Sequence, residues 1–197
     1  MTRTIQLPPH ASPSSGGRIT APRPGCARLH LLDLDNLHGC PDPNLGRVDR
    51  VHFDYETIGI GPIDLVYGAC NHDPTGTDRL SACRLYHLCQ TWGQATIRPA
   101  RGPDGADNSL IADAAGLLDA EDLGQRFDDV VIGSGDHIFE FTARRLRRAG
   151  LKVHLVVASC LSLSRELERA ADGCIWLLPD HRCVRHTEPR TKYALAA

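Results

Sequence analysis

Short apolar runs and longer stretches with helical periodicity alternate along this chain. The apolar runs, each of a length that suits a buried strand, cover residues 29–34, 63–68, 95–99, 130–132, 153–157 and 174–178. Apolar residues recur at helical spacing over residues 48–58, 79–92, 109–118, 138–149 and 165–171. Strands that alternate with helices in this way predict an α/β fold, a three-layer sandwich with a mostly parallel central sheet.

The two ends of the chain lack this pattern. Residues 1–25 are rich in Pro, Ser and Gly and contain no apolar segment, which predicts a disordered tail and argues against a secretory signal. Residues 181–197 carry His and Arg without apolar periodicity and predict a C-terminal tail. The expected folded domain therefore covers residues 26–180.

Composition narrows the class of protein. The net charge of −2 gives no global electrostatic indication of a nucleic-acid binder. The eight cysteines include no Cys-x-x-Cys motif, so we expect them to be reduced and mostly buried. No segment approaches the roughly 18 consecutive apolar residues that a membrane span needs. Together these features predict a cytoplasmic protein with no membrane segment.

Acidic residues occur where three predicted elements reach the same edge of the sheet. Asp33 and Asp136 each follow an apolar run, and Asp107 comes just before a predicted helix. In an open parallel sheet, ligands bind outside the carboxyl ends of the strands. Three carboxylates gathered there repel one another unless a divalent cation is present, and Mg²⁺ or Mn²⁺ prefers such oxygen ligands. The competing interpretation is that each Asp only caps a helix, because Asp is a common N-cap residue.

Further polar residues are expected beside this cluster. Asp35 also follows the first apolar run, and Asn36 is placed to orient Asp33 or to hold a metal-bound water. Asp113 follows Asp107 on the predicted helix and is expected to face the same cleft.

A basic face is expected on the helix predicted at residues 138–149. It carries Arg144, Arg145 and Arg148, and such a face can bind RNA phosphates. The alternative is a solvated helix face, because the helix dipole favours cations near a C-terminus.

Three motifs resemble those of the NYN domains, a branch of the PIN-like nucleases. They read Leu31-Leu-Asp-Leu-Asp-Asn36, Gly105-Ala-Asp-Asn-Ser-Leu-Ile-Ala-Asp113 and Ser134-Gly-Asp-His-Ile-Phe139. The resemblance implies a PIN-like fold and a metal-dependent endoribonuclease with RNA as its substrate. The acidic positions that it implies for metal binding and catalysis are Asp33, Asp107 and Asp136. The supporting positions that it implies are Asn36, Asp113 and Ser134.

Other functions remain open because one position departs from the family pattern. Ile138 occupies the place of a second acid, so a catalytically degenerate domain that binds RNA or a protein partner is an alternative. A phosphatase of the haloacid dehalogenase type, with Asp33 as nucleophile and Asp35 as acid/base, would need a lysine that the chain lacks before Lys152. No Gly-x-Gly-x-x-Gly follows the first run, which argues against a dinucleotide-binding domain. The oligomeric state is not indicated, and a homodimer stays open.

Overall fold

A seven-stranded sheet runs through the centre of the computed structural model, which describes residues 27–72, 79–120 and 122–184. The strands follow the spatial order β3-β2-β1-β4-β5-β6-β7. All neighbouring pairs are parallel except β6 and β7, which are antiparallel. The strand bounds are β1 Ala27–Asp33, β2 Leu65–Asn71, β3 Thr96–Ala100, β4 Phe127–Gly133, β5 Lys152–Val157, β6 Ile175–Leu177 and β7 Arg182–Cys183.

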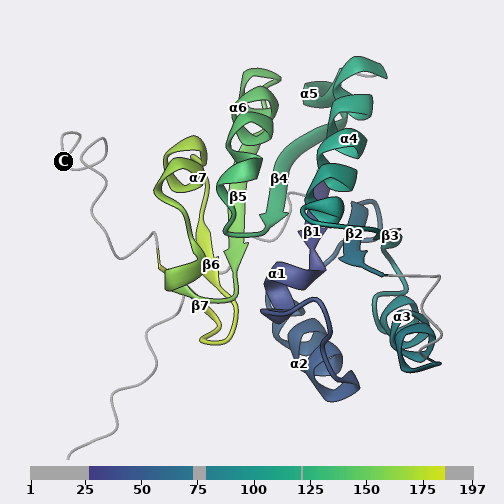
Figure 1. The fold of residues 1–197 in the computed structure, drawn as a ribbon. Coiled ribbons are helices and arrows are strands. Elements are labelled where there is room, and N and C mark those ends of the chain that lie inside the picture. The colour runs from purple at the N-terminus through teal and green to yellow at the C-terminus, as the bar shows by residue number, and fades with distance from the viewer. Residues whose placement is uncertain (1–26, 73–78, 121, 185–197) are drawn as a thin grey trace, which may run out of the picture.

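Helices connect the strands and cover both faces of the sheet (Figure 1). Their bounds are α1 Leu34–His38, α2 Leu45–Tyr55, α3 Arg79–Thr91, α4 Gly105–Ala120, α5 Leu123–Arg126, α6 Glu140–Arg148 and α7 Arg165–Ala170. Two short 3-10 helices, η1 at His137–Phe139 and η2 at Cys160–Ser162, follow β4 and β5. This arrangement confirms the predicted α/β class with a mostly parallel sheet.

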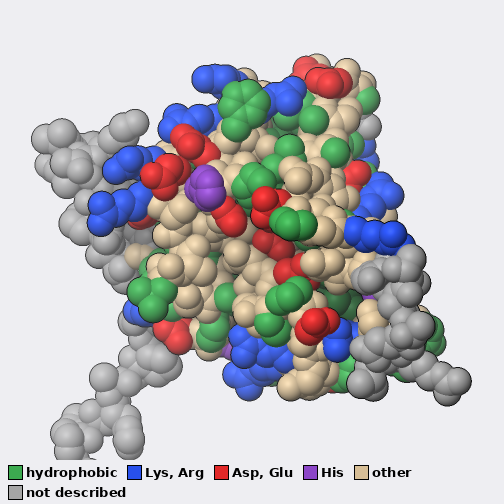
Figure 2. Space-filling model, viewed as in Figure 1, with side chains coloured by type: hydrophobic (Ala, Val, Ile, Leu, Met, Phe, Trp, Pro, Cys, Tyr) green, Lys and Arg blue, Asp and Glu red, His purple; other side chains and the backbone are tan. Residues whose placement is uncertain are grey.

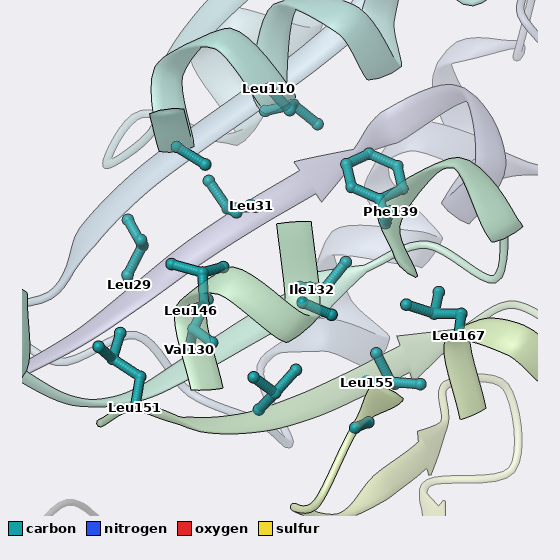
Figure 3. Packing of buried hydrophobic residues seen from close by; sticks show 14 of the residues in the cluster. Leu29, Leu31, Leu110, Val130, Ile132, Phe139, Leu146, Leu151, Leu155 and Leu167 are labelled. Carbon is teal, nitrogen blue, oxygen red and sulfur yellow. The ribbon is translucent and has the colours of Figure 1, made fainter. Parts of the chain in front are cut away.

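Two hydrophobic cores separate three layers. On one face, α4, α6 and α7 pack on alternate strand residues; Leu110 and Leu146, for example, join Leu29, Leu31 and Ile132 in one cluster (Figure 3). On the other face, α1, α2 and α3 pack on the intervening strand residues. Because successive side chains of a strand point to opposite faces, an apolar run such as that of β1 supplies both cores.

The order in which successive strands join the sheet reverses at β1. Strand β1 pairs with β2 on one side and with β4 on the other, so the connections after β1 and after β4 run toward opposite edges of the sheet. Such a switch point leaves a crevice beyond the strand ends, because the connecting segments diverge there. The crevice between the ends of β1 and β4 is therefore where a ligand site is expected.

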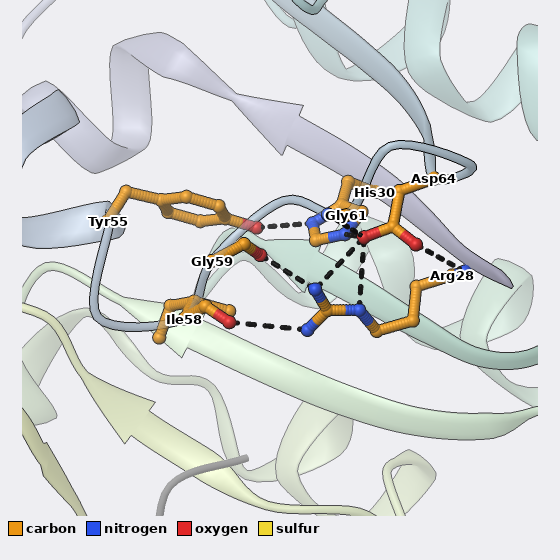
Figure 4. A network of polar contacts seen from close by, with 7 residues as sticks. All are labelled: Arg28, His30, Tyr55, Ile58, Gly59, Gly61 and Asp64. Atoms are coloured by element: carbon orange, nitrogen blue, oxygen red, sulfur yellow. Dashed lines mark hydrogen bonds and ion pairs between the residues drawn. The ribbon is translucent and has the colours of Figure 1, made fainter. Parts of the chain in front are cut away.

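The amino-terminal end of β1 is held by a buried polar network (Figure 4). The Arg28 guanidinium donates to Asp64 at 2.9 Å and to the carbonyl oxygens of Ile58 and Gly59. His30 lies between Asp64 and the Tyr55 hydroxyl, which is 2.7 Å from its Nδ1. Hydrogen bonds from His30, Gly61 and Arg28 together hold the pKa of Asp64 well below its usual range, although burial opposes the shift.

Several element boundaries differ from the sequence-based prediction. Helix α1 begins directly after β1 and was not predicted, because its five residues are too few to show a period. Helix α4 begins at Gly105, four residues before the predicted start at 109, so Asp107 lies inside its first turn. Strand β7 lies within the predicted C-terminal tail and pairs with β6, so the sheet extends past residue 180. The predicted disordered tail at 1–25 lies outside the described residues.

None of the helices in the described part of the chain combines the length and the hydrophobicity that a membrane-spanning helix requires.

Candidate active site

Acidic side chains gather in a cavity of about 380 Å³ at the carboxyl ends of β1 and β4. No described residue that lines this acidic cavity is Lys or Arg. The acidic groups form the middle of the face drawn in Figure 2. The acidic and amide side chains that line the cavity are Asp33, Asp35, Asn36, Asn71, Asp104, Asp107 and Asp136.

Asp33 ends β1 and is 4% exposed. Its Oδ1 accepts a hydrogen bond from the Asn36 backbone N–H at 3.1 Å, so the side chain is the N-cap of α1. Its Oδ2 accepts from the Ser134 hydroxyl at 3.1 Å. Burial raises the pKa of Asp33, and these hydrogen bonds oppose the shift.

Asp107 projects from the first turn of α4 toward Asp33. The two carboxyl groups lie within hydrogen-bonding range of each other. Burial raises the pKa of Asp107 to about 7, and the charges of Asp33, Asp136 and Asp104 add to the shift. Its Oδ1 is buried and has no hydrogen-bond partner. The pair therefore resists full ionisation near neutral pH unless a cation compensates its charge.

Asp136 follows β4 and caps η1. Its Oδ1 accepts from the Ile138 backbone N–H at 3.1 Å and lies 2.8 Å from Nδ1 of His137. The His137 side chain is 76% exposed. Ile138, which stands in the place of the family's second acid, packs against the hydrophobic core and does not line the cavity.

Asn36 and Ser134 join the two strand ends that carry these acids. The Asn36 side-chain oxygen accepts from the Gly135 backbone N–H at 3.2 Å. The Ser134 hydroxyl, besides donating to Asp33, accepts from the Asp136 backbone N–H at 3.2 Å. The structure therefore places both predicted supporting residues in direct contact with the acidic strand ends.

Gly135 lets the loop after β4 pack closely on the loop after β5. A Cβ atom on Gly135 would lie 2.2 Å from the carbonyl oxygen of Ser162, so only glycine fits. The Ser164 backbone N–H also donates to the Gly135 carbonyl at 2.8 Å. The position of Asp136 is thereby fixed from two sides.

Asp35 lines the cavity from α1. Its Oδ2 accepts from the Asn71 backbone N–H at 2.7 Å. Burial raises the pKa of Asp35 to about 6, to which the charges of Asp107 and Asp42 contribute. A carboxyl group with such a pKa exchanges protons near neutral pH.

Other predicted site residues lie elsewhere. Asp113 does not face the cavity as expected, because α4 turns it toward Arg98, with which it forms two hydrogen bonds of 3.1 and 3.2 Å. On α6, Arg144 pairs with Glu140 at 2.8 Å and Arg145 with Asp119 at 3.4 Å. Arg148 is exposed, and like the other two it does not line the cavity.

The donor set fits a hard divalent cation that keeps some of its waters. Within the described segments, no three Asp, Glu, His or Cys side chains are already arranged around a common ion position. However, Mg²⁺ is commonly bound through one or two carboxylates, with waters and substrate phosphates completing its shell. The facing carboxyls of Asp33 and Asp107, with the unpartnered Oδ1, match that requirement.

Comparisons with known proteins support the family and the fold. The model of the NYN domain family matches residues 67–178, a stretch that includes Asp107 and Asp136 and begins after Asp33. A solved crystal structure of a protein of unknown function from Vibrio parahaemolyticus is 18% identical in sequence, with 81% of this chain and 97% of that chain covered and a TM-score of 0.50. This likeness supports the fold alone. No curated protein matches the chain.

The family match indicates a nuclease-like function related to RNA, of a kind that typically uses divalent metals. It covers more than half of the 197 residues and agrees with the sheet topology and with the motifs at the strand ends. The chain therefore belongs to the NYN domain family, within the PIN-like nuclease superfamily.

Proposed function

We propose that this chain is an endoribonuclease that hydrolyses RNA phosphodiester bonds in the cytoplasm with the help of Mg²⁺ or Mn²⁺. The observation that supports this most directly is the contact between the Asp33 and Asp107 carboxyl groups in a cavity that no Lys or Arg of the described segments lines. Facing carboxylates destabilise a folded protein that binds no cation there. Strongly shifted acids in a cleft are typical of functional sites.

In this proposal Asp33 and Asp107 hold the cation, with Asp136 beside them. A bound cation of this kind polarises the scissile phosphate, lowers the pKa of a water and neutralises charge on the leaving oxygen. Asn36 and Ser134 each donate to a different oxygen of Asp33, so its carboxylate cannot turn away. They act as positioning residues.

Asp35 is proposed to move a proton. Its Oδ2 is occupied by the Asn71 N–H, so Oδ1 is the atom that exchanges a proton with water in the cavity. The pKa of Asp35, raised to about 6, suits a group that takes up and gives back a proton near neutral pH.

The α6 arginines stay a sequence-based prediction for RNA contacts. Arg144 and Arg145 would have to leave Glu140 and Asp119 before they could bind phosphates. Both ion pairs are exposed, so the cost of exchanging a carboxylate for a phosphate is below about 1 kcal/mol.

The test is cleavage of a labelled, mixed-sequence single-stranded RNA with Mn²⁺. We expect Asp33→Asn and Asp136→Asn each to lower the cleavage rate at least 100-fold while the proteins stay folded. Asp128→Asn is the matched control, because Asp128 is exposed at the opposite end of β4 and should not affect the rate. A wild type that binds RNA but does not cleave it, with no Mn²⁺ bound in calorimetry, would contradict the proposal. That result would favour the degenerate binding domain that Ile138 leaves open.

A further inference from the structure

The two rims of the acidic cavity differ in chemistry. One rim comprises α1 and the segment after it, where Gly39 and Pro41 line the cavity. The second rim comprises η2, where Ser162 lines the cavity. Because the cavity itself is acidic, a polyanion such as RNA is repelled unless nearby groups offer compensating contacts. The rims are where such contacts have to be found.

Arg47 places a cation on the first rim. A Cβ on Gly39 would lie 3.4 Å from Nη2 of Arg47, so the guanidinium lies directly against the cavity wall. Arg47 is exposed, whereas its neighbour Arg50 is the arginine of α2 that pairs with Asp54. Lys and Arg side chains gather over α2 in Figure 2, below the central acidic groups. The Arg47 charge is therefore available to a ligand.

Arg84 extends this rim away from the acids. It lines a smaller depression that shares Asp35, Pro41 and Asn71 with the acidic cavity, so the two hollows adjoin. Its guanidinium pairs with Asp42, whose side chain is 75% exposed. The Asp42 side of this ion pair is open to water, while the Arg84 side chain is only 22% exposed, so a phosphate can reach the guanidinium from the Asp42 side and replace the carboxylate. Arg47 and Arg84 thus offer two successive positions for backbone phosphates.

Leu161 gives the second rim an apolar tip. It is 99% exposed and directly precedes Ser162, which lines the cavity. The loop that carries it is braced, because the Ser159 hydroxyl accepts from the Ser162 N–H at 3.1 Å and the Ser162 hydroxyl donates to the Ser159 carbonyl at 2.8 Å. The close packing of Gly135 on Ser162 holds the loop against the loop that carries Asp136. Because the backbone of this loop is already ordered, little backbone entropy is lost when Leu161 contacts a ligand.

We propose that these rims seat a single-stranded RNA asymmetrically, with backbone phosphates bound by Arg47 and Arg84 and with one unstacked base packed against Leu161. This inference rests on the proposed function and adds how the substrate lies across the site. Single strands present free bases whose faces pack on apolar side chains, whereas the bases of a duplex are already stacked. This binding mode therefore favours single-stranded over double-stranded RNA.

The test is binding of a labelled single-stranded RNA dodecamer, with Ca²⁺ in place of Mg²⁺, followed by fluorescence anisotropy at several salt concentrations. We expect Arg47→Gln and Arg84→Gln each to weaken binding three- to tenfold for every sequence. Each should also make the slope of log K against log salt shallower by about 0.7, the loss of one phosphate contact on a single strand. Arg169→Gln, which changes an exposed arginine on α7 outside both hollows, is the matched control and should bind like the wild type.

The apolar rim is tested with dodecamers that carry one abasic site, moved along the strand. Wild type should lose about threefold in affinity when the abasic site falls at one particular position. Leu161→Ser should be indifferent to the abasic site and keep the wild-type salt slope. If the two arginine variants keep the wild-type affinity and salt slope, Arg47 and Arg84 do not bind backbone phosphates. If Leu161→Ser is still sensitive to the abasic site, Leu161 does not contact the base.

The cleavage assay separates this inference from the proposed function. If the wild type cleaves RNA in a metal-dependent manner but the substitutions do not change binding, the proposed binding mode is wrong and the proposed nuclease activity still holds. If the substitutions weaken binding but the wild type cleaves no RNA, the proposed binding mode holds and the proposed nuclease activity is wrong. A wild type that binds no RNA would overturn both, and Leu161 would then be tested as a contact for a protein partner.

Discussion

Asn36 connects the two strand ends that carry the acids. Its backbone N–H donates to Asp33, and its side-chain oxygen accepts from Gly135, next to Asp136. The side-chain amide supplies this acceptor without adding negative charge to a cavity that already holds several carboxylates. A residue of this kind acts through its neighbours and does not have to touch the substrate.

Replacement of Asn36 should therefore weaken metal binding more than folding. We expect Asn36→Ala to lower Mn²⁺ affinity in calorimetry by 10- to 100-fold, the usual range for a lost residue that orients a ligand. Stability should fall by only about 1 kcal/mol, because one hydrogen bond is lost. Asn108→Ala, at an exposed position on α4, serves as control. Equal metal affinity in the two variants would show that the Asn36 side chain does not position the loop that carries Asp136.

Asp107 makes the metal-free protein sensitive to pH. Its pKa is raised from 3.8 to about 7, so between these values the folded state holds a proton that the unfolded state releases. The free energy of unfolding should therefore fall as pH rises through this window. The loss is on the order of 1–2 kcal/mol, less than the full shift suggests because water reaches part of the site.

The comparison that isolates this effect is wild type against Asp107→Asn in urea unfolding with EDTA. Asp107→Asn should be the more stable of the two at pH 8, and their difference should shrink at pH 5. Titrating groups that do not interact with Asp107, such as the buried His30, are common to both proteins and cancel. Added Mn²⁺ should stabilise wild type at pH 8 and leave the variant unchanged, since a ligand stabilises only the state that binds it. A stability difference that ignores pH would contradict the raised pKa.

At the scale of elements, Asp33 has two roles because it lies at the turn from β1 into α1. Its carboxylate caps α1 and also forms the floor of the acidic cavity. The two interpretations that the sequence left open, a structural cap and a metal ligand, are therefore compatible at this position. The same holds for Asp136, which caps η1.

Two substitutions at Asp33 distinguish its role as a helix cap from its proposed role as a metal ligand. Asparagine is as good an N-cap as aspartate, so Asp33→Asn should keep stability within about 0.5 kcal/mol while it abolishes Mn²⁺ binding. Asp33→Ala should lose both the cap, at a cost of about 1 kcal/mol, and the metal. Thermal unfolding and calorimetry on the two variants measure the difference. Full Mn²⁺ binding by Asp33→Asn would show that the residue is only a cap.

At the scale of the whole molecule, the two ends of β1 differ in how their charges are balanced. At the amino-terminal end, Asp64 is surrounded by Arg28, His30 and backbone N–H donors, and its charge is compensated. At the carboxyl end, Asp33 and Asp107 face each other without a cation among the described lining residues. The first end serves stability, and the second is suited to bind a ligand.

Loss of the Asp64 charge should therefore unfold the protein more readily than loss of any cavity acid. We expect Asp64→Ala to lower the free energy of unfolding by about 3–5 kcal/mol, because Arg28 and His30 are left buried without their partner. Because the pKa of Asp64 is lowered, its contribution is present above pH 3.8 and is lost only in stronger acid. Urea unfolding at pH 7 checks the size, with Asp128→Ala as the exposed control. A cost below 1 kcal/mol would contradict the structural role of the network.

The sequence alone was sufficient for the α/β class and for most strands and helices, because buried parallel strands need continuous apolar runs and helices need a spaced apolar face. It also placed Asp33, Asp107 and Asp136 at one sheet edge, since polar residues directly after such runs lie at strand ends. Short elements such as α1 and β7 were not predicted, because an element of two to five residues is too short to show a hydrophobic period.

Only the tertiary structure decided which side chains meet. It turned Asp113 toward Arg98 and the α6 arginines toward acids on α4 and α6, and it brought Arg47 and Leu161 to the rims of the cavity. Local sequence spacing cannot show this, because contacts between distant segments depend on the angle and register at which helices pack on the sheet. The types of chemical group available were therefore set locally, and their arrangement into a site was set by packing.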